Sequence, residues 1–481
     1  MYQFRIRNGK VTTIIPAIIL FLIFYVAGLA HASFTIEDEK KLGREFYEKL
    51  DKSGVLIHEQ KTDEYMNQLG NKILTQWGSD KAPFQFHFLV IKSSAINAFA
   101  TPGGYVYVNT GLITMVETES ELAAVLAHEI SHINKRHVAS IIDKSQKIGM
   151  ATLAAVLAGA FLGGGGDLTA AVASFSLATA TTLNLKYSRE HEEEADRLGM
   201  KYLVMAGYDG KAMLDFLKLM RRYEFYSNKI PSYFLTHPGT DERITYIDAL
   251  LQTTFTQKGR ETIIGNLKRI QTVLMLEDNN LDSSLHYFQN ALQKNPDDVD
   301  FLYGLAVTQE KLGRTDESLA NFRKALSLSP DDMDINRDLG IMYFKLGRPA
   351  DAFTFLSHAL SLKGDDLDTL LYLGRSYELQ GDYTAALSLY KKIETRRNID
   401  PDMYYSIAIA YGKTNSPGDS HYYFGIYFKK KMKMDSALFH FKEALKYFPT
   451  QSDRAQEIEK EIKSIKPEEP GRRSLKTRMP G

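Results

Sequence analysis

Cysteine is absent from this chain of 481 residues. The absence excludes disulfide bonds, thiolate metal ligands, cysteine nucleophiles and the acylated cysteine of a lipoprotein anchor. A bound metal ion must therefore be held by nitrogen and oxygen atoms. Net charge is absent too, since 59 Lys and Arg residues balance 59 Asp and Glu residues. Nucleic-acid-binding proteins need a basic surface that neutralises phosphates, so we expect no nucleic-acid partner.

The residues that are present have the composition of a folded protein. Hydrophobic residues make up 44% of the chain and charged residues 25%, as in ordinary globular domains. This composition excludes disorder of the whole chain. At roughly 100–200 residues per domain, the length predicts two or three domains.

The first 32 residues have the three-part organisation of a secretory signal peptide. Three basic residues precede an apolar run from Val11 to Ala30, and Ala30-His31-Ala32 places small residues where a signal peptidase needs them. An uncleaved anchor is the alternative, because a run of this length can just span a bilayer. We expect cleavage after Ala32, and with either outcome the bulk of the chain is exported.

Residues 33–258 are predicted to form a domain of several helices and a small sheet. Strand-like runs at 84–91 and 105–108 flank a glycine-containing turn, so we predict that they pair as a hairpin. A capping box that begins at Thr118 opens a helix predicted to run to His137. Amphipathic helices are also predicted over 35–74 and 187–206.

Two apolar stretches, 148–162 and 168–183, are rich in alanine and glycine. Each is shorter than the roughly 20 residues that a membrane-spanning helix needs. One interpretation is a buried helical hairpin. The alternative is a flap, or a peripheral membrane contact through residues 148–183.

Beyond residue 262 the sequence repeats with a period of 34 residues, as shown by turns at Pro296, Pro330 and Gly364. This period is typical of tetratricopeptide repeats, which are helix pairs that bury their apolar faces by stacking on one another. We predict an α-solenoid of such repeats over 262–451.

The predicted solenoid is irregular near its end. The register of the repeat slips by about one helix at 401–417. Residues 452–481 are predicted to form a charged, disordered tail, which is basic and contains prolines beyond Lys466. The predicted fold class is therefore mainly α, with an α+β domain followed by an α-solenoid.

The sequence H-E-I-S-H at residues 128–132 lies within one of the predicted helices. Positions i and i+4 share a helix face, so both imidazoles can point at one ion. H-E-x-x-H on a helix is typical of zinc peptidases. Two unrelated histidines on a surface helix are the alternative, which the apolar residues before His128 disfavour. His137 is interpreted as a cation at the end of this helix.

A catalytic zinc ion needs a third protein ligand and an open position. In the absence of cysteine this ligand must be His, Asp or Glu, and an acidic run extends from Glu190 to Asp196. Glu192 and Asp196 share a helix face, which suits one ligand and one carboxylate that holds a ligand histidine. A solvated acidic face is the alternative.

Together these motifs resemble the zinc endopeptidase family of the CAAX prenyl proteases and HtpX-like heat-shock proteases. The resemblance covers residues 36–250, and it implies one Zn²⁺ per chain held by His128, His132 and Glu192. It also implies that Asp196 and Arg189 support the site. The motifs that carry it are H-E-x-x-H at 128–132, S-R-x-x-E-x-x-A-D at 188–196, N-A-F with G-G-Y-V-Y and T-G-L at 97–112, and T-H-P-x-T-x-x-R at 236–243.

Roles for two further side chains follow from the chemistry of such a metal. Glu129 is expected to take the proton of the attacking water and to pass it to the leaving amine. His237 is either a transition-state donor or an occupant of the fourth zinc position that keeps the enzyme latent. We hypothesise that the latent state exists at rest.

The second strand-like run is a candidate for substrate binding. Gly104, Tyr105, Val106 and Tyr107 are expected to hold an extended substrate by β-augmentation. The alternative is that this strand is paired within the core.

A signal peptide, this peptidase and the repeats together are similar to periplasmic proteases that support outer-membrane protein assembly. We therefore expect an exported zinc endopeptidase that degrades misfolded or stalled envelope proteins. The repeats would recruit protein substrates or the outer-membrane barrel assembly machinery. The alternative is a latent peptidase that acts mainly as a repeat-based chaperone or scaffold.

Overall fold

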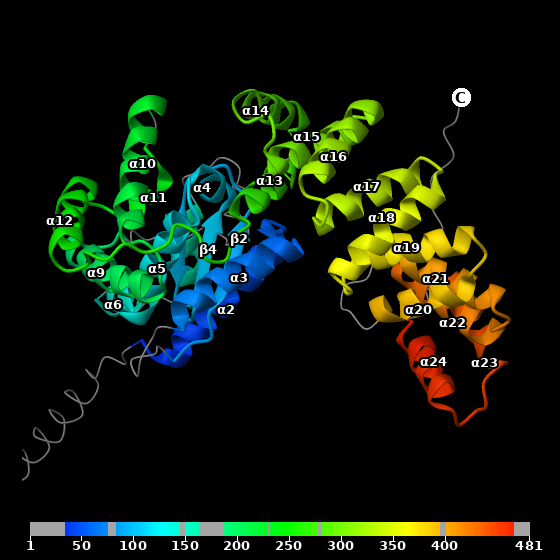
Figure 1. Ribbon diagram of the computed structural model, residues 1–481. Coiled ribbons are helices and arrows are strands. Elements are labelled where there is room, and N and C mark those ends of the chain that lie inside the picture. The colour runs from blue at the N-terminus through cyan, green and yellow to red at the C-terminus, as the bar shows by residue number, and fades with distance from the viewer. Residues whose placement is uncertain are drawn as a thin grey trace, which may run out of the picture. The chain divides into compact units, whose positions relative to one another are not determined.

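The computed structural model describes residues 34–75, 83–144, 150–162, 186–228, 230–277, 280–394 and 401–465 (Figure 1). The chain divides into two compact units, Met1–Asp278 and Asn279–Gly481. The first combines helices with a small sheet, and the described part of the second is helical, which confirms the predicted fold class. The predicted signal peptide and the apolar stretch 168–183 lie outside the described residues.

A four-stranded sheet forms the centre of the first unit, with the strand order β1-β2-β4-β3. β1 pairs antiparallel with β2, β2 pairs parallel with β4, and β3 pairs antiparallel with β4. The inner strands are thus β2 and β4. The strands are β1 (Leu56–Ile57), β2 (His87–Ile91), β3 (Ala98–Thr101) and β4 (Tyr105–Asn109).

The hairpin partner of β4 is β3, so the hairpin predicted between 84–91 and 105–108 is wrong. Gly103 and Gly104 have φ angles of 88° and 101°, a region that favours glycine, and they reverse the chain directly before β4. The strand that enters this turn is therefore the antiparallel neighbour. Because it is short and contains two alanines, it carries little of the β-branched signal that marks a strand in a sequence.

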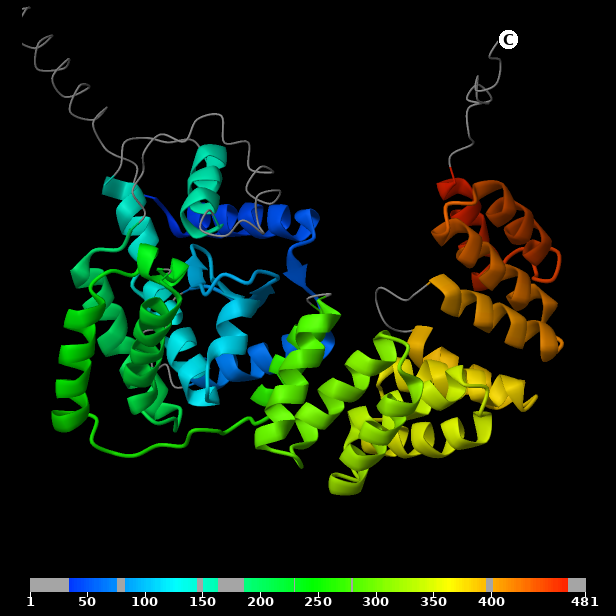
Figure 2. The same ribbon diagram turned by 90° about the horizontal axis from the view of Figure 1, so that it is seen from above.

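Side chains of the sheet alternate between two buried faces. Val106 belongs to one core, shared with α3 and α5, whereas Phe99 and Tyr107 belong to the other, shared with α2 and α7. Figure 2 shows α7 beside α2. Ala100 of β3 faces the first core, where its small side chain allows α5 to approach the sheet. The covering helices are α2 (Ile36–Ser53), α3 (Gln60–Leu74), α5 (Glu119–Asn134) and α7 (Met150–Leu162).

The segment 35–74, predicted to be helical and amphipathic, forms two helices with a short strand between them. α2 ends because Gly54 takes a left-handed conformation with φ 73°, and its N–H donates to the Asp51 carbonyl. The next residues form β1 at the edge of the sheet. α3 then begins after Glu59, whose carboxylate accepts hydrogen bonds from the first amides of the helix.

α5 begins where predicted but ends earlier. The Thr118 hydroxyl accepts a hydrogen bond from the amide of Glu121 and caps the helix. The helix stops at Asn134 because Arg136 has a φ of 55°, which interrupts the helical path. A new helix, α6 (His137–Lys144), starts at the next residue. This break redirects His137, with consequences for the site.

The first unit continues beyond its predicted end at 258. α13 packs Leu267, Ile270 and Leu274 into the core that contains α3 and α5, and the Gln271 amide donates to two carbonyls at the end of α4. The remaining helices of this unit are α4 (Thr110–Met115), α9 (Arg189–Met205), α10 (Lys211–Ser227), α11 (Ser232–Thr236), α12 (Thr240–Thr253) and α13 (Leu267–Glu277).

The first residue of α5, Glu119, is a buried carboxylate with five hydrogen-bond donors. It accepts hydrogen bonds from the amides of Ile263, Ile264 and Gly265 and from the hydroxyls of Tyr208 and Tyr65. Its side chain is 1% exposed. It therefore fastens the segment before α13 to the helix that carries H-E-x-x-H.

Replacing Glu119 with alanine should lower the free energy of unfolding of the first unit by about 3 kcal/mol or more, because several buried donors lose their acceptor. The measurement is urea unfolding followed by fluorescence of the single tryptophan, Trp77. Glu117→Ala is the matched control, since Glu117 is 61% exposed and pairs with Arg222. Equal stability of the two variants would contradict the assignment.

α7 is the described part of the apolar stretch 148–162. Phe161 is 2% exposed and stacks on Phe99 with the ring centroids 4.7 Å apart, and its carbonyl accepts a hydrogen bond from the Asn97 amide. α7 is therefore a buried helix of the first unit. Among the described helices, none combines the length and the apolarity that crossing a bilayer needs.

The second unit is a series of helix pairs, and in several of them a glycine of one helix receives a large side chain of the next. A Cβ atom at Gly374 would lie 2.4 Å from the ring of Tyr390, so only glycine allows this approach. The pairs of this kind are Gly340–Leu356, Gly374–Tyr390 and Gly425–Phe441. The helices are α14 (Leu281–Lys294), α15 (Val299–Lys311), α16 (Thr315–Leu328), α17 (Met333–Lys345), α18 (Pro349–Leu362), α19 (Leu367–Leu379), α20 (Tyr383–Glu394), α21 (Pro401–Lys413), α22 (Pro417–Lys430), α23 (Met434–Leu445) and α24 (Asp453–Ser464).

The register slip at 401–417 corresponds to one additional helix. α22 packs against both α21 and α23. Gly412 of α21 approaches Ser420 of α22, and Gly425 of α22 receives Phe441 of α23. One helix thus serves two successive pairs, which shifts the sequence pattern by one helix without interrupting the stack.

The chain does not become a tail at residue 452. The Ser452 hydroxyl accepts a hydrogen bond from the Ala455 amide and caps α24. Ile458 is fully buried and Ile465 is 6% exposed, both in the core of the repeats. An amphipathic helix therefore closes the described part of this unit, and residues 466–481 lie outside it.

Candidate metal centre

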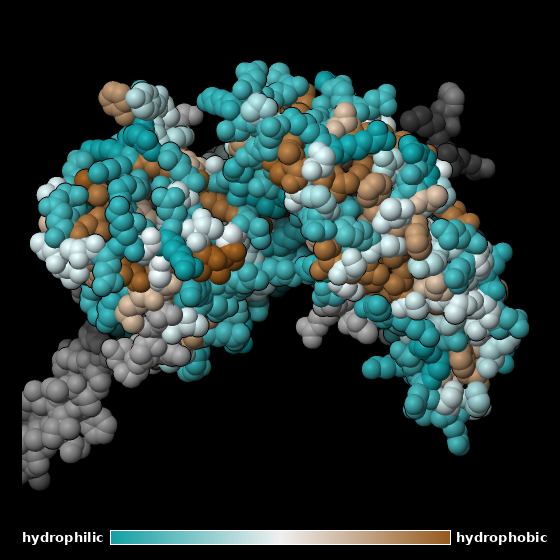
Figure 3. All heavy atoms as spheres, in the orientation of Figure 1, coloured by the Kyte–Doolittle hydropathy of each residue, from teal (hydrophilic) through white to brown (hydrophobic). Residues whose placement is uncertain are grey.

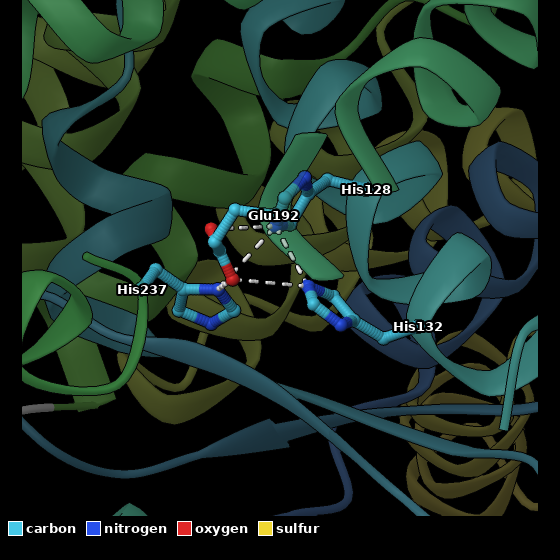
Figure 4. A group of neighbouring side chains, drawn as sticks. All are labelled: His128, His132, Glu192 and His237. Atoms are coloured by element: carbon cyan, nitrogen blue, oxygen red, sulfur yellow. Dashed lines mark hydrogen bonds and ion pairs between the residues drawn. The ribbon is translucent and has the colours of Figure 1, made fainter. Parts of the chain in front are cut away.

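Four side chains converge inside the first unit (Figure 4). His128 and His132 lie one turn apart on α5, Glu192 lies on α9, and His237 follows α11. None of the four is more than 2% exposed. One ligand atom from each lies within 4.8 Å of the others, which is an arrangement that could hold a metal ion.

The separations between these atoms are those of a small coordination sphere. Nε2 of His128 lies 2.9 Å from Nε2 of His132 and 3.3 Å from Nδ1 of His237. Oε1 of Glu192 lies 3.5 Å from Nε2 of His132 and 3.1 Å from Nδ1 of His237. Atoms about 2.0–2.2 Å from a tetrahedral ion are about 3.4 Å apart, so the four side chains fit one divalent metal ion.

α9 reaches the site because it packs closely on α5. A Cβ atom at Gly199 would lie 3.1 Å from the backbone of Ala127 and His128, so glycine permits this approach. Glu192 and Asp196, two turns and one turn earlier on α9, then face α5. Asp196 Oδ1 lies 2.8 Å from Nδ1 of His128, where it orients the ring and leaves Nε2 directed toward the cluster.

Arg243 of α12 neutralises the two buried carboxylates. Its guanidinium donates two hydrogen bonds to Asp196, at 2.8 and 2.7 Å, and its Nη1 lies 2.7 Å from Oε2 of Glu192. The hydroxyl of Tyr246 also donates to Asp196. Burial would raise the pKa of Asp196, but the Arg243 guanidinium and His128 hold it well below its usual range.

The carboxylate of Glu129 lies beside this cluster, with Oε1 3.5 Å from Nε2 of His237. It is fully buried, and neither of its oxygens has a hydrogen-bond partner in the described part of the chain. Burial raises its pKa above the usual value, although the nearby His237 and His128 oppose this shift. Buried carboxylate oxygens without a hydrogen-bond partner, beside a cluster of metal-ligand atoms, suit a group that acts on a water molecule.

The ring of His237 is held by packing and by the backbone. It stacks on Tyr233 with centroids 4.2 Å apart, and its amide donates to the Tyr233 carbonyl. The Tyr187 amide donates to the Thr236 carbonyl in the preceding turn. His237 Nδ1 thereby points to the cluster, and Nε2 lies 3.5 Å from Oε1 of Glu129.

Arg189 does not reach the site, contrary to the sequence prediction. It is the first residue of α9, its side chain is 74% exposed, and its guanidinium pairs with Glu242. The arginine that holds the buried carboxylates is Arg243, which the sequence presented only as part of a downstream motif. Sequence proximity to Glu192 favoured Arg189, but the position at the helix N-terminus directs its side chain to solvent.

The predicted substrate strand is not an edge strand. β4, which contains Tyr105, Val106 and Tyr107, is hydrogen-bonded to β2 on one side and to β3 on the other, while Gly104 lies in the turn before it. Its backbone groups are therefore used within the sheet, and β-augmentation along β4 is excluded. The outer strand on this side is β3, which packs against α5.

His137 is not the helix C-terminal cation that the sequence suggested. It begins α6, is 2% exposed, and its Nδ1 lies 2.9 Å from Nδ1 of His132. Burial lowers its pKa to about 4, so the ring is neutral at pH 7. No pattern in the sequence signals this contact, because the contact depends on the helix break at Arg136.

A glutamate beside the first of two histidines on a helix, with a third ligand from a second helix, defines the metallopeptidase class. Residues 60–251 match peptidase family M48, and residues 276–332, 308–366 and 368–396 match tetratricopeptide repeats. The first unit is therefore a metallopeptidase domain of family M48, followed by a tetratricopeptide-repeat domain.

Three curated relatives extend this comparison. The chain is 35% identical over 218 residues to the beta-barrel assembly-enhancing protease of Yersinia pestis, covering 45% of this chain and 44% of that protein. It is 33% identical over 217 residues to the protein of the same name from Escherichia coli K12, with the same coverage. It is 30% identical over 220 residues to the mitochondrial metalloendopeptidase OMA1 of Schizosaccharomyces pombe, covering 45% of this chain and 62% of that protein. The matches thus span less than half of the two bacterial relatives.

Proposed function

We propose that the protein is a zinc-dependent endopeptidase of the bacterial periplasm that degrades misfolded or stalled envelope proteins. The observation that carries this proposal is the convergence of His128, His132, Glu192 and His237 beside the buried carboxylate of Glu129, which has no hydrogen-bond partner among the described residues. The names of the bacterial relatives support a connection with β-barrel assembly. The N-terminal pattern up to Ala32 supports export.

Zinc suits the donor set better than other common ions. Three imidazole nitrogens and one carboxylate in a four-atom cluster are typical of Zn²⁺, whereas Mg²⁺ and Ca²⁺ require six or more oxygen ligands. The ligands assigned are His128, His132 and Glu192, with one ion per chain. When bound, Zn²⁺ would polarise the scissile carbonyl and lower the pKa of the attacking water.

The chain's own residues supply the proton transfer and the orientation. A carboxylate oxygen of Glu129 takes the proton of the attacking water and later delivers it to the leaving amine. Asp196 fixes the ring of His128 through Nδ1, so that Nε2 is presented to the metal. Arg243 keeps Asp196 and Glu192 ionised in a buried site.

Proteolysis of casein by the full chain tests the proposal. Cleavage should be lost on treatment with a zinc chelator and restored by added Zn²⁺. The alternative is a latent peptidase that acts mainly as a repeat-based chaperone or scaffold. Casein cleavage that is absent from both the wild type and His237→Ala, or that survives full removal of the metal, would reject the endopeptidase and leave the scaffold.

His237 is proposed to act as a latch on the zinc site. Its Nδ1 occupies the fourth corner of the cluster, 3.3 Å from His128 Nε2 and 3.1 Å from Glu192 Oε1. A catalytic zinc site keeps this position open, whereas a site with four protein ligands is closed. The resting enzyme would therefore be latent, and peptidase activity would require that His237 leave this position.

Replacing His237 with alanine should raise basal casein cleavage several-fold, because the fourth position opens while three ligands remain. The assay compares initial rates at equal zinc content. An unchanged rate would reject the latch. A decreased rate would instead support the alternative role of His237, that of a transition-state donor.

The repeats are proposed to recruit protein substrates or an outer-membrane assembly partner. Tetratricopeptide arrays present extended surfaces that bind other proteins. Figure 3 shows apolar side chains interrupting the polar surface of the repeat unit. Among the described residues, the exposed apolar side chains of this unit include Leu379 at 63%, Phe439 at 57% and Tyr405 at 46%. No nucleic-acid partner is proposed. Because α7 is buried, the predicted peripheral membrane contact through residues 148–183 is not proposed for residues 150–162.

A further inference from the structure

The helix break after α5 places a second imidazole directly behind a metal-ligand histidine. Nδ1 of His137 lies 2.9 Å from Nδ1 of His132, which is the nitrogen that faces away from the cluster. On the other side, Nε2 of His137 lies 3.1 Å from Oε2 of Glu194. His137 thus lies between a buried candidate ligand and a carboxylate whose side chain is 47% exposed.

The direction of these hydrogen bonds follows from what each atom can do. His132 directs Nε2 into the cluster, so its proton must be on Nδ1, from which it donates to Nδ1 of His137. His137 can accept there only if its own proton is on Nε2, from which it donates to Glu194. The Lys135 ammonium, 2.7 Å from Oε1 of Glu194, is the last member of this series of polar contacts.

His128 offers a direct comparison within the same site. Its Nδ1 faces the buried carboxylate of Asp196, the usual partner of a metal-bound histidine. His132 has an imidazole in the equivalent position, and that imidazole connects it to a carboxylate on the surface. The ring of His137 is itself held by stacking on His191, with centroids 4.4 Å apart and the planes 18° apart.

We propose that His137 is a positioning residue, which fixes the tautomer and the orientation of His132 for zinc. It also links the ring of His132 by hydrogen bonds to Glu194 at the surface. The proposal rests on the zinc site proposed above. It assigns a function to the break at Arg136, because a continuous helix would place the residue five positions after His132 on a different face.

The test is the affinity of the full chain for Zn²⁺, measured by competition with a chromogenic chelator. His137→Phe keeps a ring but removes the acceptor, and we expect zinc affinity to fall about 10–100-fold, the usual cost of losing such a partner. His137→Gln loses the ring but retains an acceptor oxygen, so it should recover most of the affinity. A merely structural role for the ring predicts the reverse order.

His58→Phe is the matched control, since it makes the same change at a histidine that is 55% exposed and pairs with Asp51, and it should leave zinc affinity unchanged. Equal affinity of the wild type and His137→Phe would overturn the proposal. If His137→Phe does not fold, Glu194→Ala is compared with Glu193→Ala on the same helix. Only Glu194→Ala should weaken zinc binding, and equal affinities would overturn the proposal. A wild-type chain that binds no zinc would instead reject the proposed function itself.

Discussion

Replacing Glu129 with glutamine should reduce kcat for casein cleavage by about 10²–10⁴-fold, the range expected for loss of a general base. Glutamine has nearly the same size and polarity, but it cannot accept a proton. Glu129 is fully buried, and its carboxylate oxygens have no hydrogen-bond partner among the described residues, so the substitution breaks no such bond there. The effect should therefore appear in the rate and not in the fold.

Zinc content and thermal stability of Glu129→Gln separate this interpretation from loss of the site. Both should match those of the wild type, because Glu129 is not assigned as a ligand. Glu193→Gln makes the same change at an exposed position of α9, where the residue pairs with Arg197, and it should retain full activity. If Glu129→Gln cleaved casein at the wild-type rate, the assignment of this residue as the base would fail.

Replacing Arg243 with methionine should lower the free energy of unfolding of the first unit by about 3–5 kcal/mol, the cost of leaving buried charges without a partner. Arg243 is 3% exposed, and it contacts both Asp196 and Glu192, which are themselves buried. Methionine fills much of the same space but offers no charge and no donor. Two carboxylates then remain in a site that cannot solvate them.

Urea unfolding of the metal-free protein, followed by the fluorescence of Trp77, measures this loss without a contribution from bound metal. Arg221→Met is the control, because Arg221 pairs with Glu224 and Asp241 on the surface. Exposed pairs contribute about 0–1 kcal/mol, so this control should remain close to the wild type. A similar loss in both variants would show that the buried ion pairs of Arg243 stabilise the first unit no more than the exposed pairs of Arg221 do.

The features that the sequence predicted well are those that depend on short-range periodicity. The i,i+4 spacing of His128 and His132 places both rings on one helix face whatever the rest of the fold does. The repeat period of 34 residues predicted the solenoid, since each helix pair must present the same face to the next. The fold class that these patterns predicted is confirmed, and so is the family that the sequence motifs resemble.

The structure differs from the sequence prediction where distant segments meet or where one residue changes the path of the chain. The hairpin partner of β4 is β3, whose alanine-rich sequence carries a weak strand signal. Arg189 lies near Glu192 in the sequence, yet Arg243 reaches it from α12. No local pattern contains such a contact, because it depends on how α9 and α12 pack around a shared core.

The missing cysteines determined from the start that any metal here is bound by nitrogen and oxygen. The sequence by itself also determined the helix that carries the two histidines, the acidic helix that offers a third ligand, and the repeats. Only the tertiary structure decided which groups form hydrogen bonds and ion pairs with these side chains. Arg243 supports Glu192 and Asp196, and His137 lies behind His132. The physical reason is that burial makes each charge and each N–H depend on a partner, and the packing of distant segments determines which partner is within reach.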